Sequence, residues 1–261
     1  MDKRPLGHTG IDVSPLGLGT VKFGRNEGVK YPQGFAIPGE AFLADFLTLA
    51  RDMGVNLIDT APAYGESEVR LGRLLRGQRE KWVIAGKAGE EFTDGVSAYD
   101  FSPSHFEESL TRSLKRLNTD YLDVFLIHSD GRDEEILGND DLIRAMQGFK
   151  DRGMVRAVGA STKSVAGGLM ALELLDVVMA TYNPSYTDEM AVLDQAYALG
   201  KGCLIKKALA SGHVDAFGGN PVEKAMDFAL SHPGVSSVIV GTISPVHLDE
   251  NIRAAETVLA A

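Results

Sequence analysis

The feature that most constrains this chain is a regular alternation of short apolar runs with segments of helical periodicity. The runs are rich in Val, Ile and Leu and mostly lack polar alternation, which is typical of parallel strands covered on both faces. Eight of them recur: Leu16 to Val21, Val55 to Ile58, Trp82 to Lys87, Leu122 to His128, Val155 to Ser161, Val177 to Thr181, Gly202 to Ile205 and Ser237 to Val240. The pattern predicts eight parallel strands.

The segments between these runs are predicted to be helices, because apolar residues recur in them at helical spacing. Such sets are Phe42, Phe46, Leu49 and Met53, then Phe106, Leu110, Leu114 and Leu117, and later Leu248, Ile252 and Ala255. Three helices begin with a capping side chain followed by proline, namely Ser102-Pro103, Asn220-Pro221 and Ser244-Pro245. Strand and helix therefore alternate along the whole chain.

Eight strand-helix units in 261 residues predict an α/β fold, a (β/α)8 TIM barrel that forms a single domain over residues 1–261. An open doubly wound sheet is the alternative, but no strand-turn-helix unit carries a GxGxxG fingerprint. Residues Arg4 to Ser14 are predicted to form a short N-terminal β-hairpin, turning at His8-Thr9-Gly10, that closes the bottom of the barrel. Residues 24–39 form a long loop at the end where barrel active sites lie.

Charge and cysteine content narrow the classes of partner. The net charge of −10 argues against nucleic acid, because binding phosphates requires a basic surface. Cys203 is the only cysteine, so no intramolecular disulfide is expected and a reducing compartment is favoured. No signal peptide or membrane-spanning stretch is apparent in the sequence. We therefore expect a cytoplasmic protein without a nucleic-acid, membrane or metal partner. The sequence predicts no oligomeric state.

Four polar residues stand at the carboxyl ends of three consecutive runs. Asp59 follows the second run, Tyr64 comes five positions later, Lys87 ends the third and His128 ends the fourth. Neighbouring barrel strands bring such residues to one site. A phenol has a pKa of about 10, which an adjacent ammonium lowers. With a carboxylate on the lysine and a histidine at the substrate oxygen, the set predicts a site that polarises and protonates a carbonyl.

Each of these residues has a simpler interpretation when taken alone. Asp59 and Lys87 could form a structural ion pair, Tyr64 could cover the core from a loop, and His128 could be a hydrogen-bonded core histidine. Lys87 could also form a Schiff base, as in an aldolase. The set of four is more specific than its members, because each polar group interrupts or ends an apolar run at the same end of a strand.

The segment from Asp59 to Glu68 (DTAPAYGESE) resembles the signature of the aldo-keto reductase superfamily, and Lys87 and His128 fall where that family has its lysine and histidine. Other landmarks match in the same order: RPLGHTG (4–10), LGLGT (16–20), VGAS (158–161), Tyr182-Asn183, and GTISP (241–245) with Glu250-Asn251. The resemblance covers essentially the whole chain. It implies hydride transfer between NADP(H), with NAD as an alternative, and a small-molecule carbonyl or alcohol.

The resemblance also implies roles for individual residues. Asp59, Tyr64, Lys87 and His128 would be the catalytic tetrad, with Tyr64 as the general acid. Ser161 would hold the nicotinamide carboxamide, and residues 241–251 would hold the adenosine end at a helix N-terminus. The implied cofactor contacts are Thr20, Asp59, Ser161, Thr162, Lys206, Gly241, Thr242, His247, Glu250 and Asn251.

Five positions depart from the pattern of the family. Thr162 stands where Asn is usual, Met179 where Gln is usual, and Lys206 where an aromatic residue usually stacks on the nicotinamide. The Lys206 ammonium would meet a cofactor pyrophosphate or an anionic substrate group, unless it belongs to an ordinary surface lysine pair. Gly241 and His247 replace basic residues that meet a 2′-phosphate, which keeps NAD open. These changes also motivate an alternative, a cofactor-binding sensor with little turnover.

Overall fold

Eight parallel strands close into a barrel, as predicted. In the computed structural model, which describes residues 1–260 except for the side chains at positions 215 and 216, each barrel strand pairs with the next in chain order and the last pairs with the first. The strands are β3 (Leu16–Gly19), β4 (Leu57–Asp59), β5 (Val83–Ala88), β8 (Leu122–His128), β9 (Val155–Ser161), β10 (Val177–Thr181), β11 (Gly202–Lys206) and β12 (Ser237–Val240). All strand C-termini therefore meet at one end.

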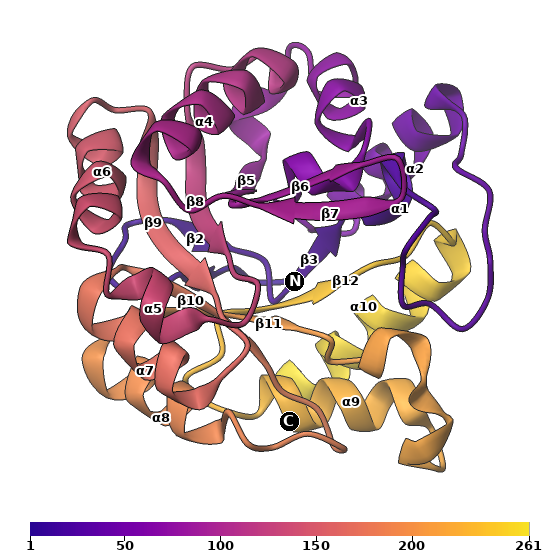
Figure 1. Cartoon of the computed structure of the whole chain (residues 1–261). Helices are drawn as coiled ribbons and strands as arrows, with labels where there is room; N and C mark the ends of the chain where they lie inside the picture. The colour runs from indigo at the N-terminus through magenta and orange to yellow at the C-terminus, as the bar shows by residue number, and fades with distance from the viewer. Residues whose placement is uncertain (261) are drawn as a thin grey trace.

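Helices surround this barrel, and Figure 1 looks into it with the helices arranged around the strands. One long helix follows each strand: α2 (Glu40–Asp52), α3 (Ser67–Leu74), α4 (Pro103–Leu117), α6 (Asp140–Asp151), α7 (Val165–Leu174), α8 (Met190–Leu199), α9 (Pro221–Leu230) and α10 (Pro245–Ala260). Shorter pieces are α1 (Val21–Gly24), α5 (Asp133–Leu137), η1 (Pro62–Tyr64), η2 (Arg79–Lys81), η3 (Ala210–Gly212) and η4 (Val214–Phe217). The single-domain barrel is thus built as the alternation predicts.

The predicted helix starts are present. The side chains of Ser102, Asn220 and Ser244 each accept a hydrogen bond from the backbone N–H three residues on. The predicted apolar face of α2 is partly wrong, because Phe42 and Leu49 are exposed. The buried face of that helix instead consists of Leu43, Phe46, Leu47 and Ala50.

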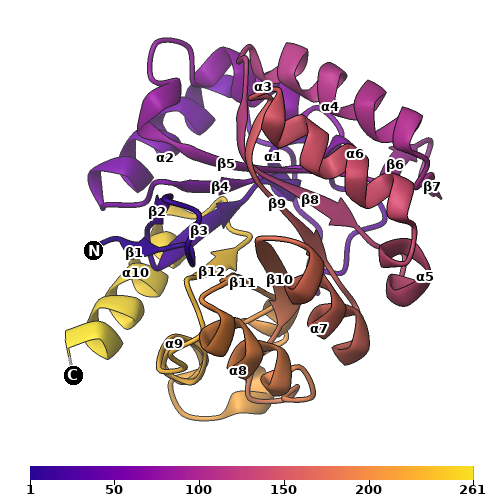
Figure 2. The ribbon, with the colours of Figure 1, turned by 90° about the vertical axis from the view of Figure 1, so that its left-hand side faces the viewer.

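The N-terminal hairpin closes the bottom of the barrel, as expected. Its strands β1 (Arg4–Pro5) and β2 (Asp12–Val13) pair antiparallel. Leu6, Ile11 and Val13 are buried and pack with side chains of the barrel interior. Figure 2 shows this hairpin on the left, at the opposite end of the barrel from the second hairpin described next. The bottom is therefore filled by apolar side chains.

A second hairpin, β6 (Glu90–Thr93) and β7 (Val96–Tyr99), follows β5 and was not predicted. It turns at Asp94 and Gly95, whose φ angles of 51° and 82° are both positive, as a type I′ turn requires. The hairpin stands over the C-terminal end of the barrel, where β6 packs against η1. It therefore adds side chains to the end where the polar residues gather.

In the part of the chain that the structure describes, no helix is both long and apolar enough to cross a bilayer.

Candidate active site

The four candidate catalytic residues come together at the C-terminal end of the barrel. Asp59 is the last residue of β4, Lys87 lies near the end of β5, and His128 is the last residue of β8. Tyr64 ends η1, the turn that immediately follows β4. The rings of Tyr64 and His128 meet edge-on with their centroids 6.2 Å apart. The convergence expected from neighbouring strands is therefore present.

Lys87 is the centre of this cluster. Its ammonium, on a side chain only 1% exposed, donates to Tyr64 Oη at 3.1 Å and to the carbonyl oxygen of Thr60 at 3.1 Å, and it forms a short ion pair with Asp59 Oδ1. An ammonium has three N–H groups, so all of its donors are used. The Tyr64 hydroxyl donates in turn to Asp59 Oδ2 at 3.4 Å. These bonds fix the phenol oxygen in one place.

The electrostatics of the cluster favour neutral forms of Tyr64 and His128. Burial, and then the charges of Asp59 and Glu90, hold the pKa of Tyr64 well above its usual value. The expected lowering of this pKa by Lys87 is therefore not found, and the phenol keeps its proton at neutral pH. Burial, together with nearby cations led by Lys87, holds the pKa of His128 well below its usual value. The site thus holds a stored phenol proton beside a neutral imidazole.

Burial also opposes charge within the ion pair itself. It raises the pKa of Asp59 and lowers that of Lys87, while the attraction between the two groups opposes both shifts. The short contact and the two further acceptors on Lys87 keep the pair together.

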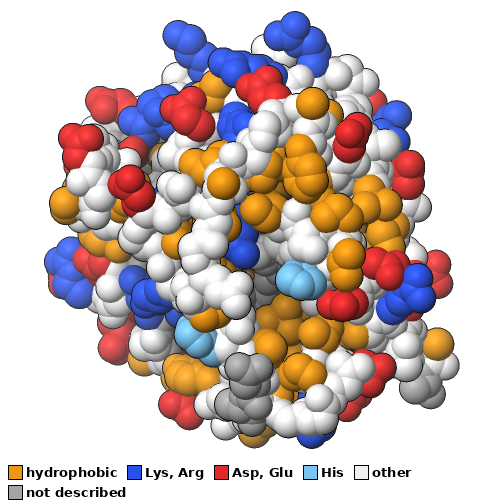
Figure 3. All heavy atoms as spheres, turned by 90° about the vertical axis from the view of Figure 1, so that its right-hand side faces the viewer, with side chains coloured by type: hydrophobic (Ala, Val, Ile, Leu, Met, Phe, Trp, Pro, Cys, Tyr) orange, Lys and Arg blue, Asp and Glu red, His pale blue; other side chains and the backbone are white. Residues whose placement is uncertain are grey.

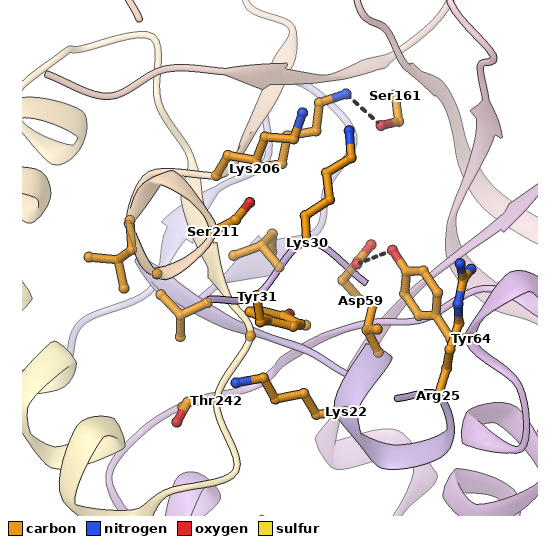
Figure 4. Close-up of a pocket in the computed structure, with 18 of the residues that line it drawn as sticks. Lys22, Arg25, Lys30, Tyr31, Asp59, Tyr64, Ser161, Lys206, Ser211 and Thr242 are labelled. Carbon is orange, nitrogen blue, oxygen red and sulfur yellow. Dashed lines mark hydrogen bonds between the residues drawn. The ribbon is translucent and has the colours of Figure 1, made fainter. Parts of the chain in front are cut away.

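The tetrad lines one cavity of about 840 Å³, a size typical of small-molecule sites. Figure 4 shows Tyr64 and Asp59 pointing toward each other, with Lys206 reaching Ser161 nearby. Figure 3 shows one face of the molecule, hollowed near its centre, with hydrophobic side chains around the hollow and basic and histidine side chains close by.

Most of the predicted cofactor residues line the same cavity. Besides Asp59, the ones that do so are Ser161, Lys206, Gly241, Thr242, His247, Glu250 and Asn251. Thr20 and Thr162 do not line it. The Thr20 side chain is fully buried and donates to the carbonyl oxygen of Asp59 at 2.9 Å, so it supports the end of β4. Thr162 is 1% exposed, and its hydroxyl has no hydrogen-bond partner among the described residues.

Lys206 is no ordinary surface lysine. Its ammonium donates to Ser161 Oγ at 2.9 Å and makes a shorter bond to the carbonyl oxygen of Thr162. Burial lowers the pKa of Lys206 to about 7, against the opposing charge of Glu189. The alternative of a surface lysine pair is therefore wrong for Lys206, although Lys207 beside it is exposed.

The cavity is basic, although the chain as a whole carries a charge of −10. Five lysines line it in addition to Lys87: Lys22, Lys30, Lys163, Lys206 and Lys207. Among the described side chains, none of these five has a carboxylate within 4.0 Å. A basic cavity in an acidic protein suits a ligand with several negative charges, such as a dinucleotide. Within the described residues, no group of three or more His, Cys, Asp or Glu is arranged to hold a metal ion.

The long loop after α1 forms one wall of the cavity. Its residues 30–33 line the space, and Figure 4 shows Lys30 and Tyr31 within it. The Tyr31 hydroxyl approaches Gly241 so closely that a Cβ at that glycine would lie 2.4 Å away. Pro32 lies against Gly212 of η3. The loop therefore reaches across from β3 to the segments that follow β11 and β12.

Glu90 is the functional candidate that the sequence analysis missed. It belongs to β6, lines the cavity, and places Oε2 3.1 Å from Nδ1 of His128. The hairpin that carries Glu90 could have been predicted from the dipeptide Asp94-Gly95, which favours a two-residue turn between short strands. Tyr99 of β7 and Lys163, two residues after β9, were missed as further lining residues.

Comparison with known proteins agrees with this geometry. The model of a family described as the aldo/keto reductase family matches residues 15–217. A solved structure of a putative aldo-keto reductase from Pseudomonas aeruginosa is 50% identical, has a TM-score of 0.90, and the match covers 98% of this chain and 95% of that one. An uncharacterized oxidoreductase of Bacillus subtilis, YqkF, is 26% identical over 98% of this chain and 91% of its own length. An NADH-specific methylglyoxal reductase of Escherichia coli is 30% identical over 70% of this chain and 59% of its own length.

Proposed function

This chain belongs to the aldo/keto reductase family, and we propose that it transfers a hydride between NADPH and the carbonyl group of a small molecule, with Tyr64 as general acid. The observation that carries this proposal is the phenol of Tyr64, held by Lys87 and Asp59 at the floor of a basic cavity. The cofactor, when bound, supplies the hydride. Side chains of this chain would donate the proton, stabilise the phenolate that remains and hydrogen-bond the substrate.

Tyr64 is suited to donate its proton to a carbonyl oxygen. Its pKa is raised, so the proton is present at neutral pH, and the ammonium of Lys87 stands 3.1 Å from the phenol oxygen to stabilise the phenolate left behind. Asp59 keeps Lys87 charged and in place. His128 is held neutral beside Tyr64, where it can hydrogen-bond the reacting oxygen.

The choice of NADPH over NADH rests on Lys22. Gly241 and His247 offer little to a 2′-phosphate, because one has no side chain and the imidazole of the other cannot make the bidentate, permanently charged contact of an arginine. The Lys22 ammonium lies 4.0 Å from the ring centre of Tyr31, whose hydroxyl approaches Gly241 in the same cavity. We propose that Lys22 supplies the missing cation. The Lys22→Met variant should lose about 10-fold or more in affinity for NADPH and keep its affinity for NADH. An equal loss for both cofactors contradicts this assignment.

A second candidate function is a cofactor-binding sensor with little turnover. One observation favours it: the Lys206 ammonium already donates a hydrogen bond to the hydroxyl of Ser161, the residue expected to hold the nicotinamide carboxamide. A cofactor would have to displace this ammonium to reach Ser161.

The aldolase alternative is disfavoured, because Lys87 is 1% exposed and its three donors are engaged, whereas a Schiff-base lysine must present a free amine to its substrate.

One experiment separates the reductase from the sensor. The purified protein is mixed with NADPH or NADH and a panel of aldehydes, ketones, α-dicarbonyls and aldose sugars, and both cofactor oxidation and alcohol formation are followed. The reductase hypothesis predicts one alcohol formed per cofactor oxidised with at least one carbonyl class. Tight cofactor binding without oxidation by any member of the panel overturns it in favour of the sensor. Running the productive reaction backwards with the matching alcohol then shows which direction is favoured.

A further inference from the structure

Arg25, the first residue after α1, links the long loop to the turn that carries Tyr64. Its Nη1 donates to the backbone carbonyl oxygen of Ala63 at 3.0 Å, within η1. Its Nε and Nη2 donate to the carbonyl oxygens of Glu27 and Gly28 at 2.8 and 3.0 Å, at the start of the loop. Arg25 and Tyr64 both line the cavity, as Figure 4 shows. One side chain therefore joins two of the segments that surround the candidate general acid.

The bond to Ala63 acts directly on Tyr64, because the carbonyl of Ala63 and the N–H of Tyr64 belong to one planar peptide group. This N–H donates to the carbonyl oxygen of Ala61 at 3.0 Å, so both polar atoms of the group are held. The backbone that follows is closely packed, since a Cβ at Gly24 would lie 2.5 Å from the carbonyl oxygen of Tyr64. Of these restraints on Tyr64, the bond from Arg25 is the one made by a side chain.

The guanidinium of Arg25 is itself held in one orientation. It lies over the ring of Phe92 in β6, 3.3 Å from the ring centre, and the side chain is only 11% exposed. A guanidinium is planar and carries its five N–H groups in fixed directions. Three accepting carbonyls and one aromatic face together therefore fix both its position and its plane. The second hairpin thus takes part in the same link, because Phe92 belongs to it.

We propose that Arg25 is a positioning residue for Tyr64: by holding η1 against the long loop and β6, its guanidinium keeps the phenol oxygen where proton transfer requires it. That oxygen lies 3.1 Å from the ammonium of Lys87. A displacement of about 1 Å at a reacting group can cost about 100-fold in rate. The effect on turnover rests on the proposed reductase function, whereas the ordering of the turn by Arg25 does not.

Two variants and one control test the effect on turnover. In Arg25→Ala, kcat should fall by about 10- to 100-fold, while the KM of a small aldehyde and the Kd of NADPH change by less than about 3-fold. Arg25→Lys keeps the positive charge, which Glu90 faces at 3.8 Å, but cannot offer planar donors to three carbonyls, so its kcat should be intermediate. Arg112→Ala is the matched control, because Arg112 holds β6 from its other face through Glu91, and its kcat should be unchanged.

The ordering of the turn is measured without turnover, from the hydrogen exchange of the Tyr64 amide in protein labelled with ¹⁵N-tyrosine. The chain has seven tyrosines, and the signal missing in Tyr64→Phe identifies this amide. Its exchange should be at least about 10-fold faster in Arg25→Ala and unchanged in Arg112→Ala. Methylguanidinium added to Arg25→Ala should slow the exchange again and raise kcat. Methylammonium, which carries the same charge without the planar donors, should do neither.

Unchanged exchange of the Tyr64 amide in Arg25→Ala overturns the proposal. An equal change in Arg112→Ala also overturns it, since the effect would then come from packing of the hairpin. Full kcat in Arg25→Lys, or equal rescue by methylammonium, overturns it as well, because charge alone would then suffice. If Arg25→Ala does not fold, exchange and kcat in Arg25→Lys decide the question. Faster exchange in the Arg25 variants, when even the unmodified protein reduces no carbonyl, supports the ordering of the turn and refutes the reductase function instead.

Discussion

Replacing Lys87 by methionine separates the structural role of the buried ion pair from its chemical role. The change removes three hydrogen bonds and leaves Asp59, which is 3% exposed, with only the Tyr64 hydroxyl at 3.4 Å. Breaking a buried pair in this way costs about 3–5 kcal/mol of unfolding free energy, because the remaining charge is left without compensation. The double variant Asp59→Asn/Lys87→Met removes both charges and should be more stable than Lys87→Met by at least about 1 kcal/mol. Neither variant should reduce a carbonyl at an appreciable rate.

The sign of the pH dependence follows from Asp59. Burial raises the pKa of Asp59, and Lys87 is the group that opposes this most strongly. Without Lys87 only the Tyr64 hydroxyl and the charge of Lys206 remain to offset burial, so the pKa of Asp59 in the folded state rises further above its unfolded value. A carboxyl with a raised folded pKa is destabilising once it must ionise, so the penalty grows as pH rises above the unfolded pKa of about 3.9 and is complete above the folded pKa. Lys87→Met should therefore be less destabilised at pH 5 than at pH 8.

Urea unfolding followed by the fluorescence of Trp82, the only tryptophan and a buried one, measures these differences. A loss of less than about 1 kcal/mol in Lys87→Met at pH 8 would refute the reasoning. The reasoning would also be refuted if the double variant lost as much unfolding free energy as Lys87→Met and Asp59→Asn lose together when each is measured alone. Such additivity would mean that the two charges do not interact.

Two further predictions concern glycine packing and the charge of Lys206. Gly159→Ala would place a Cβ 2.1 Å from the carbonyl oxygen of Val177, so we expect a loss of about 1–3 kcal/mol in urea unfolding; Gly148→Ala in α6 meets nothing within 4 Å and should instead gain about 0.5–1 kcal/mol. Because the pKa of Lys206 is lowered to about 7, its ammonium is lost as pH rises through neutrality, and the affinity for oxidised cofactor, whose nicotinamide ring is cationic, should rise relative to that for reduced cofactor. Fluorescence titration at several pH values should show this trend in the unmodified protein and not in Lys206→Met, and a trend of equal size in both would contradict it.

The barrel could be predicted because its strands are local features of the sequence. Apolar runs such as Leu122 to His128 are buried on both faces, and their composition alone reports this. The second hairpin could not be predicted in the same way. Residues 90–99 lie mostly at the surface, so no apolar period marks their strands. Only the turn residues Asp94 and Gly95 carry a local signal.

Within the candidate site, positions at strand ends were predictable and contacts between distant segments were not. Asp59, Lys87 and His128 were found because each interrupts or ends an apolar run. The bond from Lys206 to Ser161 joins residues 45 apart and depends on the register of β9, β10 and β11, which the sequence does not specify. Thr20 was expected to contact the cofactor, but its hydroxyl donates to the backbone carbonyl of Asp59 instead. Burial and the charge of Asp59 are the main causes of the raised pKa of Tyr64, but a further contribution comes from Glu90, a neighbour from the unpredicted hairpin.

The central claim, that Tyr64 gives the proton in carbonyl reduction, is tested most directly by a single turnover of Tyr64→Phe. The complex of protein and reduced cofactor is mixed rapidly with an aldehyde that the unmodified protein reduces, and cofactor oxidation is followed in time. We predict a rate lower by about 10²- to 10⁴-fold, the contribution usual for a general acid, with unchanged affinity for the cofactor. Hydride transfer at the rate of the unmodified protein would contradict the claim.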